Sequence, residues 1–310
     1  MMDGQIMIDR LGEIAALGTS VSWTVTALAF EYAGKRIGSL ALNILRLAVA
    51  LLIFAIVGLI VRGNPVPLDA PPELWFWLSL SGLVGFVFGD IFLFQSYIDI
   101  GARKALVVFV SSPLITALLG FGLLGEKISP VGIAGMCIVI AAITWVVVSS
   151  KDGEGEKDAM SVTRKSRRTR GVVFAFFGAL GQSGGLVLSK MAAPSYDAIA
   201  ATQIRVIAGL VGFLFVGIFL RRCRECVVAV KNIPALKALA IGAFFGPFLG
   251  VSLGMFAIQR TSSGIAATLM GLTPILILVP SVLIRKERIT IREVLGSVLA
   301  VFGSALIFLH

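Results

Sequence analysis

Residues 38–61 read GSLALNILRLAVALLIFAIVGLIV, and Arg46 is the one charged residue in this apolar run. The hydrocarbon core of a bilayer is about 30 Å thick, and a helix of about 20 apolar residues crosses it. The run therefore predicts a membrane-spanning helix. Arg46 lies roughly 12 Å inside one end of that helix, at a rise of about 1.5 Å per residue.

The whole chain of 310 residues has the same apolar character. It is 57% hydrophobic and 14% charged, with a mean hydropathy of +0.98. A soluble domain carries roughly 25% charged residues and about 45–50% apolar ones, so these values exclude a soluble fold and intrinsic disorder. The formal net charge of +10 does not indicate nucleic-acid binding, because the charges lie between long apolar runs.

Apolar runs of this length occur ten times and predict an all-α integral membrane protein with ten transmembrane helices. The runs are 11–31, 38–61, 74–97, 105–124, 130–149, 171–189, 198–220, 235–258, 265–284 and 290–309. Residues 151–170 form a polar linker between the fifth and sixth runs. Its basic rear part, from Arg164 to Arg170, predicts an orientation signal or a contact with anionic lipids.

Residue types that carry enzyme chemistry are scarce. Cys223 and Cys226 have CxxC spacing, but no second pair follows, and the one histidine is His310. A zinc site needs four ligands, so we expect two reduced thiols and no metal. The chain also lacks a P-loop and a dinucleotide fingerprint. We therefore expect no catalytic residue, no cofactor and no enzymatic activity.

The two halves of the chain resemble each other. When the first half is shifted by 159 positions, Gly12 falls on Gly171 and Arg46 falls on Arg205. A shift of 161 pairs Gly85 with Gly246, Gly89 with Gly250, Ser112-Pro113 with Thr273-Pro274, Glu126 with Glu287 and Gly135 with Gly296. Because five helices are an odd number, the second copy enters the membrane from the opposite side. The sequence thus predicts two inverted five-helix repeats, a plan typical of transporters that work by alternating access.

Several of these features together resemble the drug/metabolite transporter (DMT) superfamily, EamA type. They are the ten spans, the arginine of the second span, Pro113 in the fourth span and the charged corners at Gly125-Glu126-Lys127 and Arg285-Lys286-Glu287. The resemblance covers nearly the whole chain. It implies that residues 1–150 and 171–310 are two EamA-like repeats and that the protein exchanges small metabolites across a membrane.

Charged side chains inside spans are costly, by about 2.5–3.5 kcal/mol at the helix centre, and so are candidate site residues. Arg46 and Arg205 offer bidentate donors to a carboxylate or phosphate, or they bind an internal acidic partner. Asp90 has no acidic counterpart, since Val251 takes its place in the second half. It is predicted to contact substrate or exchange a coupling proton, or to pair with Arg46.

Five polar or aromatic residues complete the predicted substrate site. Trp23 and Gln182 occupy matching positions in the two halves and either line a pocket or pack against neighbouring helices. Lys190 occupies the position that matches Glu31, at the end of its span. Lys190 is a candidate for a substrate carboxylate. Gln95 and Tyr97 end the third span, and Tyr97 shares a helix face with Asp90. Glu31 is either functional or interfacial.

Two proline steps predict a central pathway. Ser112-Pro113 and Thr273-Pro274 fall at matching positions in the fourth and ninth spans. A proline inside a helix frees a carbonyl that lipid cannot satisfy, so each break faces protein or a wet cavity. We expect hinges there, or simple packing kinks. The glycines at 85, 89, 246, 250 and 254 predict close helix packing.

The distribution of basic residues predicts the orientation in the cell membrane. Of 27 lysines and arginines, 20 lie in loops after odd-numbered spans and five lie in the termini and the other loops. The positive-inside rule then places the odd loops in the cytoplasm and both termini outside. Members of the superfamily are usually drawn with cytoplasmic termini, so the charge count and the resemblance differ here.

The sequence as a whole predicts a secondary transporter, an exporter, of a small polar or anionic metabolite such as an amino acid. The partners expected are that metabolite and the lipid bilayer, with a homodimer left open and no nucleic acid. The alternative is a membrane-embedded enzyme or flippase that acts on a lipid-linked substrate.

Overall fold

The computed structural model describes residues 2–124, 129–149, 159–192, 196–260, 269–284, 286 and 289–307, which form helices and their connections without any strand. Within these residues, seven helices are long and apolar enough to cross a bilayer. They are Leu11–Ile37, Ser39–Arg62, Pro72–Ile100, Ala102–Leu123, Ser166–Ser189, Ala198–Phe219 and Ile233–Gly254. Large apolar side chains stay uncovered on the outside, as at Ile60 (76% exposed) and Phe219 (78% exposed). Such a surface suits lipid and makes the chain a multi-pass membrane protein.

The elements of the first half lie in the order α1 (Met2–Ile37), α2 (Ser39–Arg62), α3 (Pro72–Gly82), η1 (Leu83–Gly89), α4 (Asp90–Ile100), α5 (Ala102–Phe109), α6 (Ser111–Leu124) and α7 (Pro130–Ser149). The second half has α8 (Ala159–Ala192), α9 (Ala198–Phe219), α10 (Arg224–Val230), α11 (Ile233–Ala243), η2 (Phe244–Gly250), α12 (Val251–Arg260), α14 (Thr273–Leu276), α15 (Leu278–Leu283) and α16 (Ile291–Ile307).

Local chemistry explains where several helices begin and end. Gly63 ends α2 in a left-handed conformation, with φ of 72°, and its N–H donates to the carbonyl of Leu59. Glycine is the usual residue at this position because it has no Cβ to clash. Asp197 begins α9 by accepting a hydrogen bond from the N–H of Ala200 at 2.9 Å. Such a side chain satisfies one of the free N–H groups of a first turn.

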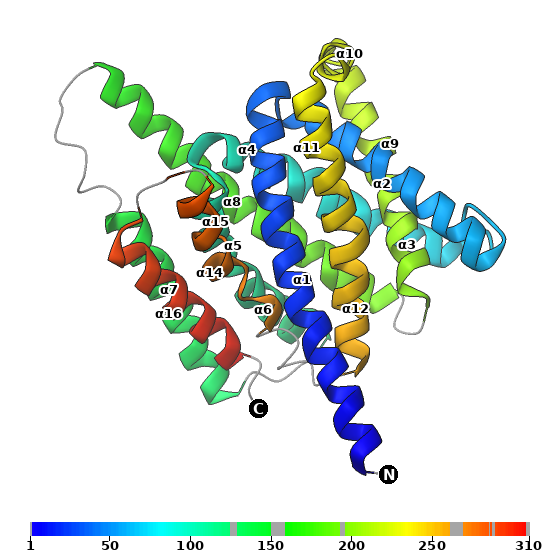
Figure 1. The fold of residues 1–310 in the computed structure, drawn as a ribbon, viewed down its shortest axis with the longest axis horizontal. Coiled ribbons are helices and arrows are strands. Elements are labelled where there is room, and N and C mark those ends of the chain that lie inside the picture. Colours follow the sequence, from blue (N-terminus) through cyan, green and yellow to red (C-terminus); the bar gives the residue numbers. More distant parts are fainter. Residues whose placement is uncertain are drawn as a thin grey trace.

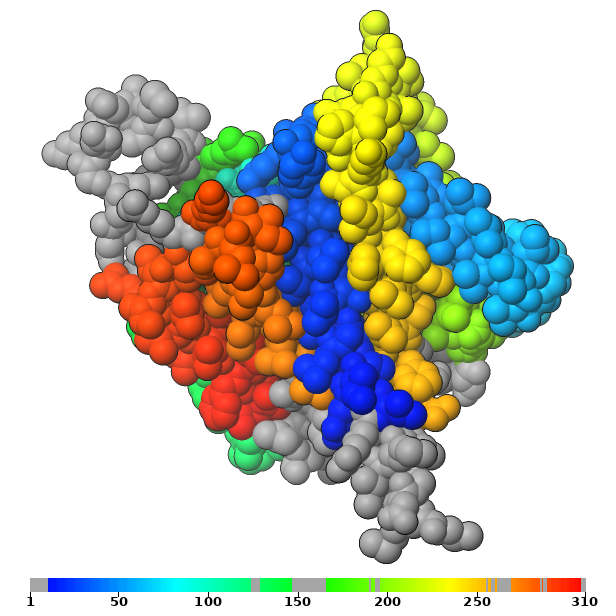
Figure 2. All heavy atoms as spheres, viewed as in Figure 1, coloured from blue at the N-terminus to red at the C-terminus, as the bar shows by residue number. Residues whose placement is uncertain are grey.

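The two halves are packed into each other rather than side by side. The helix α1 packs along the column of α11, η2 and α12, and α8 packs in the same way along α3, η1 and α4 (Figure 1). The helix α2 contacts α9, and α7 lies against α16. Figure 2 shows α1 beside the α11–α12 column on one face, with α14–α15 on its other side. Each of these main contacts joins one half to the other, so the core forms between the halves.

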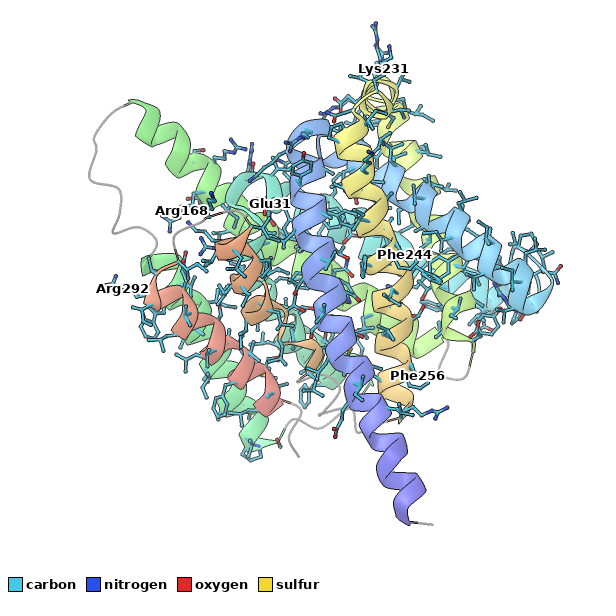
Figure 3. The ribbon with its side chains drawn as sticks, in the orientation of Figure 1. Glu31, Arg168, Lys231, Phe244, Phe256 and Arg292 are labelled. Carbon is cyan, nitrogen blue, oxygen red and sulfur yellow. The ribbon has the colours of Figure 1, made fainter. Side chains whose placement is uncertain are left out.

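Figure 3 labels three residues at or along the column of α11, η2 and α12, one of them charged and two of them aromatic. Lys231 lies at the end of α10, and Phe244 and Phe256 follow further along the column. The largest buried cluster of apolar residues lies nearby, where Phe30 of α1 contacts Phe94 of α4 edge to face, with ring centroids 5.1 Å apart. The N-terminal end of α1 and the C-terminal end of α16 point toward the same end of the molecule (Figure 1).

Both halves contain a π-helical segment at the same position. The segment η1 covers Leu83–Gly89 and η2 covers Phe244–Gly250, which are matching ranges at a shift of 161. Such segments are rare and often stand at functional sites. A Cβ on Gly181 would lie 2.5 Å from Cα of Gly89, and one on Gly185 would lie 2.7 Å from Cα of Gly85. The glycines expected to pack closely therefore bring α8 and η1 into backbone contact.

The structure refines the predicted ranges without confirming all of them. The predicted third and eighth spans each contain a π-helical segment, and the fourth is divided at Val110 between α5 and α6. Regular helix periodicity does not reveal these interruptions, because they depend on contacts with other helices. The fifth range coincides with α7 (Pro130–Ser149), and the described part of the ninth range holds α14 and α15. Neither is among the seven helices given above. The number of ten spans therefore stays a prediction.

The predicted linker also differs in part from the structure. Its basic rear part is helical and forms the beginning of α8, which starts at Ala159. Its front part lies outside the described residues, as do Glu126 and Glu287 of the charged corners. The domain boundaries at 150 and 171 stay a prediction.

We predict that the substitution Gly181→Ala lowers the free energy of unfolding by about 1–3 kcal/mol, because overpacked methyl groups cost that much in a tight contact. The new methyl would meet the backbone of Gly89, which has no flexible end to move away. Unfolding in mixed detergent micelles measures the loss.

The matched control is Gly122→Ala in α6. Nothing lies within 4 Å of a Cβ at Gly122. Replacing glycine by alanine inside a helix then stabilises by about 0.5–1 kcal/mol. Equal stability of the Gly181→Ala variant and the unmodified chain would contradict the close crossing.

Candidate functional site

A buried polar network joins α2, α4 and α8 at the centre of the molecule. The side chains of Arg46 and Asp90 are 4% and 3% exposed, and Nη2 of Arg46 donates to Oδ2 of Asp90. Nε2 of Gln182 donates to Oδ1 of the same carboxylate. Both oxygens of Asp90 thus have a donor, one from its own half and one from the other half. Among the alternatives left by the sequence, the structure shows the pairing of Asp90 with Arg46.

Asn43 completes the surroundings of Arg46. Its Oδ1 accepts a hydrogen bond of 3.0 Å from Nε of Arg46, and its Nδ2 donates to the carbonyl of Ser39 at 3.0 Å. A buried ion pair loses its hydration, and this cost is offset only where further hydrogen bonds satisfy the remaining groups. Asn43 supplies such a bond. It was not among the predicted site residues, although it lies three positions before Arg46 and therefore on the same helix face.

Aromatic rings enclose the two repeat-related arginines. The guanidinium carbon of Arg46 lies 4.7 Å from the ring centroid of Phe94 and 5.7 Å from that of Phe86. The guanidinium carbon of Arg205 lies 5.0 Å from the centroid of the same Phe86 ring. Guanidinium groups at such distances are attracted to the ring face. Phe86, a residue of η1, therefore links Arg46 of one half to Arg205 of the other.

Arg205 lacks the partners that Arg46 has. Its Nε is buried and has no hydrogen-bond partner among the described residues. Its repeat counterpart Arg46 uses Asn43 there, but the residue that matches Asn43 is Thr202, whose hydroxyl donates to the carbonyl of Ala198 at 2.8 Å. The shorter threonine therefore leaves Nε of Arg205 without a partner.

Trp23 and Tyr97 pack against neighbouring helices and form no hydrogen bond to Arg46 or Asp90 within the described part of the chain. Trp23 is partly buried against η2, where a Cβ on Gly250 would lie 3.1 Å from its Nε1. Tyr97 is 3% exposed, and its ring centroid lies 5.5 Å from that of Phe94. Tyr97 therefore contributes to the packing around the site through Phe94, and Trp23 contributes to the packing of α1 on η2.

Gln95 lies away from the network. Its Oε1 accepts from Oγ of Ser39 at 2.9 Å, and its Nε2 donates to Oδ1 of Asp99 at 3.2 Å. It connects the beginning of α2 to the end of α4. The side chain of Lys190 lies outside the described residues.

The two proline steps begin helices rather than interrupt them. Pro113 is the third residue of α6, and Pro274 is the second residue of α14. Proline is tolerated in a first turn because the N–H there has no partner within the helix. Oγ of Ser183 on α8 donates to the carbonyl of Ser112 at 2.9 Å, and Thr273 donates to the carbonyl of Met270 at 3.1 Å. The expected hinge role stays a prediction.

Other charged groups have structural partners outside the network. Glu31 is buried and accepts from the N–H of Ala102 at 2.8 Å, so it caps the first turn of α5. Two arginines of the basic cluster, Arg167 and Arg170, bind Asp99, and Arg170 does so through two bonds of 2.8 Å. Lipid contact by this cluster stays a prediction. No group of three or more histidine, cysteine or acidic side chains that could hold a metal lies in the described part of the chain.

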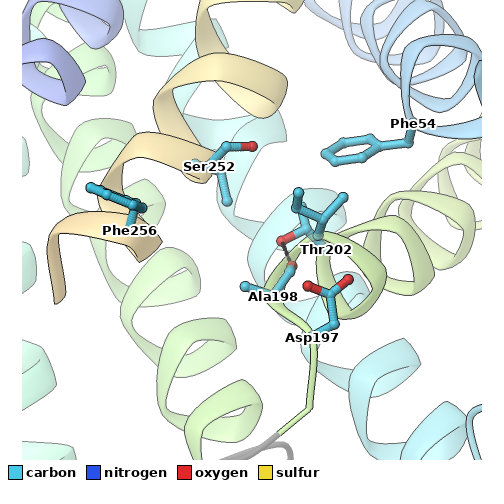
Figure 4. A pocket seen from close by; sticks show the side chains of 8 residues that line it. Phe54, Asp197, Ala198, Thr202, Ser252 and Phe256 are labelled. Atoms are coloured by element: carbon cyan, nitrogen blue, oxygen red, sulfur yellow. Dashed lines mark hydrogen bonds between the residues drawn. The ribbon is translucent and has the colours of Figure 1, made fainter. Parts of the chain in front are cut away.

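A pocket of about 160 Å³ opens between α2, α9 and α12 (Figure 4). It is lined by Phe54, Asp197, Ala198, Ile199, Thr202, Val251, Ser252 and Phe256. Several lining residues are repeat counterparts of closed contacts in the first half. Ser39 and Gln95 are joined by a hydrogen bond, whereas the matching Ala198 and Phe256 both line the pocket. The same region is thus closed in one half and open in the other.

A helical membrane protein that holds charged groups between two related halves has the architecture of a transporter. The EamA-like transporter family matches residues 10–148 and again residues 169–309. The chain belongs to this family, which confirms the resemblance noted from the sequence. It is thus a membrane transporter of the drug/metabolite transporter superfamily, whose EamA-type members are transporters and not enzymes.

A solved structure, described as "Crystal structure of protein", has the same fold. It is 17% identical, with a TM-score of 0.63, and the similarity covers 95% of this chain and 94% of the other. A comparison with curated proteins found no match.

We predict that Asp90→Asn and Arg46→Met each lower the free energy of unfolding by about 3–5 kcal/mol, because each leaves one buried charge without its partner. The double variant is expected to lose about 0.5–3 kcal/mol less than the sum of the two single losses, because its members interact directly. Denaturation in detergent micelles measures all three values.

The control is Arg222→Met. Arg222 pairs with Glu225, but its side chain is 54% exposed. An exposed pair contributes about 0–1 kcal/mol, so this variant should stay close to the unmodified chain. Strictly additive losses at Arg46 and Asp90 would contradict a direct pair.

Proposed function

We propose that this protein is a secondary transporter that moves a small polar or anionic metabolite, such as an amino acid, by alternating access. The observation that carries the proposal is the buried network of Arg46, Asp90 and Gln182, with Arg205 beside it, at the junction of the two halves. A charged group inside the membrane is costly and usually marks a substrate or ion route. Proton exchange at Asp90 remains a hypothesis within this proposal.

The arrangement of the helices supports two inverted five-helix repeats. In Figure 1 the helix α1 runs upward from the lower end of the molecule, whereas its counterpart α8 runs downward from the upper left. The contacts are also exchanged, because α1 packs on the α11–α12 column and α8 packs on the α3–α4 column. The beginning of α1 and the end of α16 lie toward the same end, which fits an even number of crossings.

The difference between the halves supports alternating access. The beginning of α2 is tied to α4 by the bond between Ser39 and Gln95, and Asn43 reaches the carbonyl of Asp90 at 3.4 Å. The matching beginning of α9 is separated from α12 by the 160 Å³ pocket. If the halves exchange these two conformations, the opening moves to the other side of the membrane.

The charge distribution supplies the proposed direction of this opening. The loop after the first span is basic and adjoins the closed contact at Ser39, whereas the open pocket adjoins the loop before Asp197. With odd-numbered loops in the cytoplasm, the pocket opens to the outside and both termini lie outside. Export of the metabolite from this conformation is the direction that we propose.

The test is flux in liposomes that contain the purified chain, with its three native cysteines replaced by alanine. We expect downhill flux of small amino acids or organic acids, measured with radiolabelled compounds, above that of protein-free liposomes. In a Ser39→Cys, Gln95→Cys variant, a short bifunctional thiol reagent should stop the flux because it holds the first half closed. A monofunctional reagent is the control and should leave most of the flux.

No flux of any compound above the protein-free level would contradict transport. Unchanged flux after complete cross-linking, verified by mass spectrometry, would contradict alternating access while leaving transport itself intact.

A further inference from the structure

The two arginines of the repeat differ in one respect that concerns the ligand. Arg46 has the carboxylate of Asp90 and the amide of Asn43 as partners. Arg205 has the corresponding position but neither partner, since Val251 matches Asp90 and Thr202 matches Asn43. The second half therefore contains the cation of such a pair without the anion, in a partly buried side chain whose Nε is buried.

The position of the missing anion adjoins an open space. Val251 and Thr202 both line the pocket between α9 and α12. Thr202 lies three residues before Arg205 on α9, so both belong to one helix face. The counterpart of the place filled by the Asp90 side chain is thus next to a cavity of about 160 Å³ and one helical turn from Arg205.

The charges of the network favour an anion. Two guanidinium groups, Arg46 and Arg205, lie on the ring of Phe86, and one carboxylate, Asp90, lies between the halves with them. These three groups carry one net positive charge. A buried donor without a partner is unfavourable, so an anionic ligand gains both charge pairing and the free, buried Nε donor of Arg205.

We propose that the substrate carries a carboxylate that binds Arg205 in the second half as Asp90 binds Arg46 in the first. This inference rests on the proposed transport function and names its substrate class, a small carboxylate. The substrate completes the second ion pair of the repeat, and a neutral analogue cannot do so. Arg46 and Asp90 then form the fixed pair, whereas Arg205 and the substrate form the exchangeable pair.

The test uses Val251→Asp, which supplies an internal carboxylate at the repeat position of Asp90, and Val251→Asn as its neutral control of the same shape. The probes are acetate, pyruvate, succinate and glutamate. Each is compared with the analogue in which every carboxylate is replaced by an amide. The purified full chain is held in lipid nanodiscs, and the midpoint of thermal unfolding is titrated with each probe. Binding to the folded chain raises this midpoint.

We expect at least one carboxylate, and none of the amides, to stabilise the unmodified chain and the Val251→Asn variant with saturation. In Val251→Asp the affinity should fall about 10- to 100-fold, because hydrogen bonds to charged groups contribute about 1.5–3 kcal/mol and the new carboxylate already occupies Arg205. Arg205→Gln should show a loss of the same size, even if its unliganded midpoint changes.

Two outcomes would overturn the inference: none of the four carboxylates stabilises the unmodified chain, or the affinity is the same in Val251→Asp and Arg205→Gln as in the unmodified chain. The liposome flux assay separates this failure from failure of the proposed function. Flux of a neutral compound without carboxylate binding would support the proposed transport function but contradict a carboxylate substrate. Carboxylate binding without any flux would support the binding site at Arg205 but contradict the proposed transport function.

Discussion

The structure depends on how a guanidinium is accommodated inside a membrane-spanning helix. Arg46 lies about two turns inside α2, so its charge needs partners supplied by the protein. Asp90, Asn43 and a set of aromatic rings provide them. Because Asp90 is also bound by Gln182 of the other half, satisfying this one charge fixes how the two halves meet. The backbone contact of η1 with α8 brings Asp90, the next residue after η1, to the place where this can happen.

Duplication of this arrangement produces a related but unequal second half. The arginine, the π-helical segment and the proline step recur at matching positions, whereas the carboxylate and the amide do not. In the first half Arg46 and Asp90 therefore neutralise each other. In the second half Nε of Arg205 has no partner among the described residues, and Thr202, one helical turn away, lines a pocket. We propose that this difference gives the transporter a permanent ion pair in the first half and a substrate-binding arginine in the second half.

Much of this could be predicted from the sequence, because charged residues are so rare within the apolar runs that Arg46, Asp90 and Arg205 stand out. Gln182 was predicted only as a pocket residue, since contact between positions 92 residues apart depends on how the helices pack. Asn43 was missed because an amide at the beginning of a span carries no charge to draw attention. Gln95 was expected in the site but faces Ser39 and Asp99, because its position near the end of α4 directs it to another contact. The π-helical segments could not be predicted from helix periodicity: the glycines of η1 meet the backbone of α8, whereas those of η2 meet the side chains of Thr26 and Trp23.

The central claim is that the two halves exchange a closed and an open conformation. Distances between paired spin labels test it most directly, with one pair at positions 39 and 95 and a second at the matching positions 198 and 256. We expect each pair to show a short and a long distance in nanodiscs, and any condition that lengthens one pair to shorten the other. Two distances that always lengthen together, or that remain single and fixed during transport, would contradict the exchange.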